Sequence, residues 1–305
     1  RDVAPSRGLG DVYKRQAINK RTWSEKWSEY RKKPGSFIMF ILVHLATLIT
    51  VLSIGFLLAY VLVKGIPNLN ADIFSWEYTS DNCSLVPALI NTVYMTLLSL
   101  LIAGPIGIFA AIYLVEYAKT GNKLVGVVRI TAETLTGIPS IVYGLFGMLF
   151  FTNACGLRLS LISGALTLAI MVLPVIMRTT EEALMAVPKS YREGSFGLGA
   201  GKLRTVFKVV LPSAVPGILS GIILATGRIV GETAALIYTA GSVAKMATKL
   251  TDSTRTLAVH MYLLSKEGLH TDQGYATAVV LLVLVVLINF ASDKIAGKVA
   301  ADKAN

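Results

Sequence analysis

Long apolar runs alternate with short polar intervals along most of the chain. The run from Phe37 to Val63 carries no Asp, Glu, Lys or Arg, and it exceeds the roughly 20 residues that cross the hydrocarbon of a bilayer. Five further apolar runs follow it, and together they predict an all-α, polytopic membrane protein with about six transmembrane helices. The predicted spans are residues 37–63, 86–115, 124–151, 159–177, a fifth from residue 213 and a sixth at 275–290.

The segments that flank these spans predict the orientation of the chain. Residues 17–36 are basic and contain two tryptophans, which is typical of a cytoplasmic segment at the membrane interface. Residues 291–305 form a second basic segment and predict a cytoplasmic tail. An even number of spans then puts both ends of the six-span domain, residues 37–290, in the cytoplasm. Residues 1–16 differ in character from the rest and resemble a translated linker, so we leave them out of the fold.

Glycine and proline interrupt the third predicted span. Residues 137–147 contain Pro139 and several glycines, and a broken helix at membrane depth is tolerated where it is buried or lines a cavity. The segment is therefore a candidate wall of a pathway. Close helix packing through Gly144 and Gly147 is the alternative. A stripe of small residues in the fifth span predicts another close approach between helices: Gly217, Gly221 and Ala225.

Composition and charge agree with a membrane protein. Of 305 residues, 54% are hydrophobic and only 15% are charged, with a mean hydropathy of +0.63, which leaves too little polar surface for a water-soluble fold. The net charge of +11 raises the possibility of nucleic-acid binding. However, the basic residues cluster between the apolar spans without interleaved aromatic residues, which favours positive-inside topology and predicts no nucleic-acid partner.

Two pairs of charged residues fall inside predicted spans. An arginine or acid in mid-helix costs about 2.5 to 3.5 kcal/mol on insertion scales, so Arg129 with Glu133, and Arg228 with Glu232, should face protein or water. A spacing of four residues places each pair on one helix face, where the acid can hold the arginine. Arg228 would keep donors for a passing oxyanion such as phosphate. These four residues are the candidate substrate pathway, and purely structural ion pairs are the alternative.

The polar interval at 179–212 is the longest charged interval between two spans. It predicts two short helices with an apolar edge, a knob that fits a groove on another protein. Its Glu193-Gly194-Ser195, Gly199 and Val209-Val210-Leu211-Pro212 resemble the EAA loop of ABC importer permeases. The resemblance implies docking onto a separate ATPase subunit. The implied docking residues are Tyr191 and Leu198 as apolar anchors, Glu193 as a polar contact, Gly199 as the turn, and Gly194, Ser195, Leu211 and Pro212.

Two further blocks, residues 137–147 and 227–235, are similar to the permeases of phosphate-specific ABC importers, closest to the PstA type. The resemblance covers the chain from about residue 35 onward. It implies a type I ABC importer permease fold in the bacterial inner membrane, and phosphate transport by alternating access. The implied partners are a PstC-type permease, a PstB-type ATPase dimer and an external PstS-type phosphate-binding protein. Spans four and five would transmit movement of the docking loop to a gate.

The motifs of several other functions are missing. The chain has no Gly-x4-Gly-Lys-Ser/Thr sequence, so ATP must be hydrolysed by another subunit. We find no metal-ligand spacing, no catalytic set and no cofactor motif, and we predict a transport subunit rather than an enzyme. Cys83 and Cys155 allow either a disulfide or free thiols. The alternatives are a permease for another oxyanion, a membrane-embedded enzyme, and a regulatory or scaffold subunit.

Overall fold

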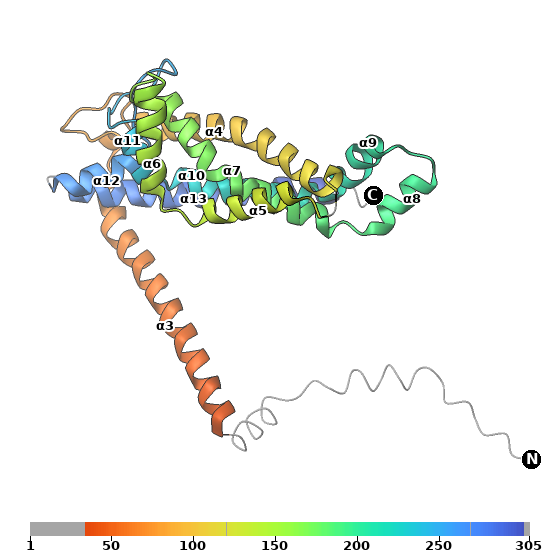
Figure 1. Ribbon diagram of the computed structural model, residues 1–305. Helices are drawn as coiled ribbons and strands as arrows, with labels where there is room; N and C mark the ends of the chain where they lie inside the picture. Colours follow the sequence, from red (N-terminus) through yellow and green to blue (C-terminus); the bar gives the residue numbers. More distant parts are fainter. Residues whose placement is uncertain (1–33, 120, 269, 302–305) are drawn as a thin grey trace, which may run out of the picture. The chain divides into compact units, whose positions relative to one another are not determined.

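The computed structural model describes residues 34–119, 121–268 and 270–301, and these ranges are helical with no strand (Figure 1). They contain five helices long and apolar enough to cross a membrane, or six when one bent pair is counted as a span. The predicted all-α membrane architecture is thereby confirmed. The predicted linker at 1–16, nearly all of the basic segment at 17–36 and the last residues of the tail lie outside the described residues.

The described helices differ widely in length. The long ones are α3 (Pro34–Gly65), α4 (Val86–Ile112), α7 (Leu161–Ala186), α10 (Leu211–Val230) and α13 (Thr271–Ala301). The shorter ones are α5 (Lys123–Thr136), α6 (Ser140–Gly147), α8 (Lys189–Gly197), α9 (Lys202–Thr205), α11 (Ala234–Thr239) and α12 (Leu257–Glu267). π-helical turns occupy Tyr113–Tyr117, Met148–Ala154 and Val206–Val210, and 3-10 turns Ile66–Asn68 and Ala71–Phe74. The helices from Val61 onward belong to one compact unit.

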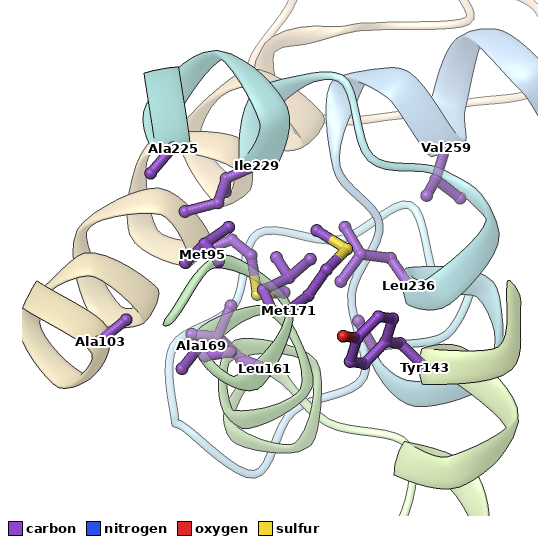
Figure 2. Packing of buried hydrophobic residues seen from close by; sticks show 14 of the residues in the cluster. Met95, Ala103, Tyr143, Leu161, Ala169, Met171, Ala225, Ile229, Leu236 and Val259 are labelled. Atoms are coloured by element: carbon purple, nitrogen blue, oxygen red, sulfur yellow. The ribbon is translucent and has the colours of Figure 1, made fainter. Parts of the chain in front are cut away.

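Helices α4, α7 and α10 pack along one another and form the core (Figure 2). Met95 of α4 and Met171 of α7 are fully buried there, beside Ile229 of α10. The predicted stripe of small residues lies at the contact between α10 and α7. A Cβ atom added at Gly217 would lie 2.6 Å from the Cβ of Ala183, and one at Gly221 would collide with a side chain of α7. Glycine is therefore needed for this approach.

The third predicted span is two helices rather than one. α5 and α6 meet at an angle of 104°, and Pro139 is the N-cap of α6. The Tyr143 hydroxyl donates to the carbonyl of Leu135 at 2.8 Å, which holds the two helices together. A Cβ atom at Gly144 would lie 2.8 Å from the backbone of Ala235, and one at Gly147 would collide with α7. Close packing through these two glycines is confirmed, while a pathway wall stays a prediction.

Two spans extend further into the polar interval at 179–212 than predicted. α7 continues to Ala186 rather than ending near residue 177. The fifth span was expected from residue 213, but the helix is continuous from Lys202 to Val230 through α9, a π-helical turn and α10. Proline usually ends or kinks a helix because its ring clashes with a preceding carbonyl. Here the wider π-helical turn ends at Val210, two residues before Pro212, and the helix passes through this position.

Candidate docking loop and intramembrane charges

α8 and α9 form the two arms of a helical hairpin at one end of the helices (Figure 1). Gly199 stands between them with a φ of +81°, a conformation that glycine adopts without strain. The hydroxyls of Ser195 and Thr205 lie 2.8 Å apart and join the two arms. The interval thus has the two short helices and the turn that its sequence predicts.

Most of the predicted docking residues point away from the helix bundle. Leu198 is 92% exposed and Tyr191 is 51% exposed, and Glu193 is exposed beside them. Apolar side chains with this exposure on a short hairpin form a surface suited to a protein partner. Leu211 differs, because it packs partly buried against the cluster that α4, α5 and α7 form. It supports the loop from beneath instead of facing outward, and Pro212 beside it is half-buried at the start of α10.

A largely buried ion pair holds α8 against the π-helical turn Tyr113–Tyr117, which follows α4, and the sequence analysis does not predict it. Arg192 donates to the Glu116 Oε1 from Nε at 3.0 Å and from Nη2 at 2.6 Å. It also donates to the carbonyls of Leu184 and Val187, each at 2.9 Å, and so satisfies the C-terminal end of α7. The two side chains are 18% and 8% exposed. One arginine therefore fixes the docking hairpin to two helices.

The second arm contacts the same π-helical turn. The Lys202 ammonium lies 5.1 Å from the ring centroid of Tyr117, and Glu116 precedes this tyrosine in the π-helical turn Tyr113–Tyr117. π-helical turns are rare and frequent at functional sites. Both arms of the hairpin are thus held by one turn at the end of α4. Arg192 and Glu116 are 76 positions apart in the sequence, and no local sequence pattern predicts such a pair.

The predicted pairing of Arg129 with Glu133 is wrong. Arg129 pairs with Glu181 of α7, and Glu133 lies 3.6 Å from Arg178, which also pairs with Glu182 at 3.3 Å. The reason is that α5 packs against α7, so Arg129 and Glu133 pair across the interface rather than with each other along α5. These residues surround a pocket of about 280 Å³. They form a network between α5 and α7 near the docking hairpin.

The predicted pairing of Arg228 with Glu232 is also wrong. α10 ends at Val230, so a spacing of four residues no longer puts both side chains on one face. Glu232 is 8% exposed and its Oε1 accepts a hydrogen bond from the Ala235 N–H at 3.1 Å, which caps α11. No described carboxylate forms an ion pair with Arg228. Its guanidinium N–H groups are therefore open to another ligand.

Arg228 lines an open pocket of about 680 Å³. Side chains from four helices meet there, with Thr136 from α5, Val175 from α7, Ser220 from α10 and Asn289 from α13. A cation among a few polar groups and apolar walls is the composition of a small-anion site. The four pathway candidates therefore divide into Arg228 in this pocket, Glu232 as a helix cap, and two charges in the network between α5 and α7.

The opposite end of α4 holds a long connecting segment. Asn91 is fully buried, and its amide bonds the carbonyl of Lys245 at 2.9 Å and the N–H of Ala247 at 2.9 Å. Thr92 accepts from the N–H of Leu257 at 2.8 Å. The two cysteines are free thiols, with Cys83 buried and Cys155 exposed, which decides against a disulfide.

Comparisons with known proteins agree with these features. The family described as binding-protein-dependent transport system inner membrane component matches residues 103–301. The probable ABC transporter permease protein YqgI of Bacillus subtilis (strain 168) is 33% identical over 270 residues, covering 81% of this chain and 90% of that protein. The phosphate transport system permease protein PstA of Xylella fastidiosa (strain 9a5c) is 40% identical over 179 residues, covering 58% and 62%.

A solved structure shares the fold. It is a chain of a bacterial alginate ABC transporter in complex with alginate pentasaccharide-bound periplasmic protein, with a TM-score of 0.65. The match covers 88% of this chain and 97% of that chain at 13% identity. At that identity the likeness concerns the fold alone, and it extends over nearly the whole of the solved chain.

Proposed function

Because the chain belongs to the family of binding-protein-dependent transport system inner membrane components, we propose that it carries inorganic phosphate through the bacterial inner membrane by alternating access. It is a permease subunit of an ABC importer with a type I importer fold, and it is not itself an enzyme. Its family implies an ATPase and a substrate-binding protein as partners. The proposed partners are a PstC-type permease, a PstB-type ATPase dimer and a PstS-type phosphate-binding protein, with both termini cytoplasmic.

The observation that carries phosphate as the substrate is Arg228. It is a charge among membrane-spanning helices with no carboxylate partner among the described residues, and it faces an open pocket. Guanidinium groups bind phosphate with two parallel hydrogen bonds. A relative that is 40% identical is a phosphate transport system permease. A phosphate dianion in this pocket would supply the negative counter-charge that Arg228 lacks.

The docking hairpin supports coupling to an ATPase. The exposed face of Tyr191 and Leu198 would enter a groove on that subunit. The hairpin continues directly into α7 and α10, and both helices contribute residues to the Arg228 pocket. Movement of the hairpin would therefore reach the pocket through two continuous helices.

Uptake of radiolabelled phosphate tests the proposal, in a strain that lacks its own phosphate permease. The chain should restore uptake together with its partner subunits, and Arg228→Gln should abolish it without loss of the assembled complex. Arg228→Lys keeps the charge but not the planar fork, so it should retain only part of the rate. Full uptake by Arg228→Gln would refute the role of this residue and favour a scaffold function. Restored sulfate uptake without phosphate uptake would favour another oxyanion.

A further inference from the structure

A buried polar cluster lies at the N-terminal end of α12, at the end of the bundle opposite the docking hairpin (Figure 1). Arg255 is 6% exposed, Thr256 is 1% exposed and His260 is fully buried. The Tyr78 ring packs on two of these side chains. Its centroid lies 4.6 Å from the guanidinium carbon of Arg255 and 5.9 Å from the imidazole centroid of His260. The protein therefore encloses these groups.

The arginine in this cluster has an unused binding edge. Its Nε and Nη2 atoms have no hydrogen-bond partner among the described residues, and no described carboxylate pairs with it. These two nitrogens point their hydrogens along the same edge of the guanidinium, and this edge binds an oxyanion through two parallel hydrogen bonds. A buried charge without a partner is strongly destabilising. Arg255 thus requires a counter-charge that the described chain does not supply.

The start of α12 also favours negative charge. Thr256 is the N-cap residue of this 11-residue helix, but its hydroxyl caps no backbone N–H and has no other partner among the described residues. Of the first N–H groups, that of Leu257 is bonded by Thr92. Helix N-termini attract anions because their N–H groups and the helix dipole point toward the ligand. The hydroxyl and the helix end therefore add to the attraction of Arg255.

A large cavity lies next to the cluster. It has a volume of about 1300 Å³, and its lining includes Tyr78, the basic side chains Arg158 and Lys245 and the acidic side chains Glu77 and Asp252. The backbone N–H of Arg255 donates to the backbone carbonyl of Val243 at 3.1 Å, and Val243 is also part of the cavity wall. Tyr78, whose ring stacks on the Arg255 guanidinium, thus lies both against this arginine and in the cavity wall.

We propose that Arg255, Thr256 and the N-terminus of α12 bind a small oxyanion that enters from this cavity past Tyr78. The existence of the site rests on the unpaired arginine, and only the identification of the oxyanion as inorganic phosphate rests on the proposed function. The site is separate from the pocket of Arg228, which the side chains of α5, α7, α10 and α13 form. The transporter would then hold phosphate at two places on this subunit.

Equilibrium dialysis with radiolabelled phosphate tests the site, on the assembled transporter in nanodiscs without nucleotide and without the external binding protein. Arg255→Met should weaken phosphate binding by about tenfold or more, because it removes two charge-assisted hydrogen bonds. Lys245→Met removes a positive charge from the cavity but leaves the arginine edge in place. This control should change the affinity by no more than about twofold, since exposed charges are screened.

Thermal unfolding shows whether a weaker affinity reflects loss of folding. Without phosphate, Arg255→Met should unfold at the same or a higher temperature than the unchanged protein, because it removes an unpaired buried charge. Phosphate should raise the unfolding temperature of the unchanged protein more than that of the variant. Equal phosphate binding by the two proteins would overturn the proposal and indicate that buried water satisfies Arg255.

Other anions separate this proposal from the proposed function. If sulfate binds in an Arg255-dependent manner and phosphate neither binds nor is taken up, the oxyanion site stands and phosphate as the substrate fails. If Arg228→Gln loses uptake but keeps Arg255-dependent binding, the two sites are independent. Binding of chloride alone with the same dependence would overturn the oxyanion assignment, since chloride does not use the two-bond edge.

Discussion

Replacing Glu116 by Gln should loosen the docking hairpin without unfolding the membrane helices. The change removes the negative charge that two nitrogens of Arg192 contact at 3.0 and 2.6 Å. The arginine keeps its bonds to the carbonyls of Leu184 and Val187. Its partner site is 8% exposed, so water does not readily replace the carboxylate. The expected effect is therefore a higher population of the state in which α8 is detached from α4.

The magnitude follows from the kind of bond that is lost. A hydrogen bond to a charged group contributes about 1.5 to 3 kcal/mol. Arg192 is 18% exposed and retains two carbonyl partners, which places the expected loss at the lower end, about 1.5 to 2 kcal/mol. At about 1.4 kcal/mol for each factor of ten, the detached state should become roughly 10 to 30 times more populated.

Amide hydrogen exchange measures this opening directly. Residues 189–197 should exchange roughly 10 to 30 times faster in Glu116→Gln, while the exchange of α7 and α10 in their membrane-spanning parts stays unchanged. ATP hydrolysis by the assembled transporter should continue with a smaller amount of substrate transported per ATP. Glu193→Gln is the matched control for exchange, because Glu193 lies in the same helix and is exposed. Equal exchange in the two variants would refute the anchoring role of Glu116.

The other predictions concern the turn of the hairpin and the buried histidine. Gly199→Val forces a β-branched residue into a φ of +81°, so it should weaken retention of the ATPase subunit in a pull-down by roughly tenfold; normal retention would contradict the docking role. Burial and Arg255 lower the pKa of His260 to about 3, so its neutral form stabilises the fold above pH 6.5. In phosphate-free buffer that stability should fall by about 1 kcal/mol per pH unit below 6.5, and His260→Gln should flatten this part of the unfolding profile.

Hydropathy and motif spacing predict the parts of this protein that depend on local sequence. Apolar runs report membrane spans because a fixed bilayer thickness requires a fixed helix length. The spacing of Glu193, Gly199 and Pro212 reports the hairpin because the turn needs a residue with positive φ at one position. The clash at Gly217 shows the same principle for helix packing. The spans and the turn are determined within one helix or one turn, and the small-residue stripe is visible within one helix although its contact lies on another.

Charge partners could not be predicted, because they depend on which helices meet. A spacing of four residues favours an ion pair only while the helix continues, and the end of α10 at Val230 separates Arg228 from Glu232. Arg129 instead pairs with a residue of α7, and the partners Arg192 and Glu116 are 76 positions apart. The sequence does place a charge at Arg228, but only the packing of four helices shows that a pocket lies beside it.

The unbroken helix from Lys202 to Val230 joins one arm of the docking hairpin to Arg228. A rotation imposed at Lys202 turns the guanidinium through the same angle, because an intact helix is stiff against torsion. With the side chain roughly 6 Å from the helix axis, a turn of about 20° displaces its charge by about 2 Å. That displacement is enough to break a hydrogen bond. An ATPase bound to the hairpin could therefore control how Arg228 binds phosphate by rotating this one helix.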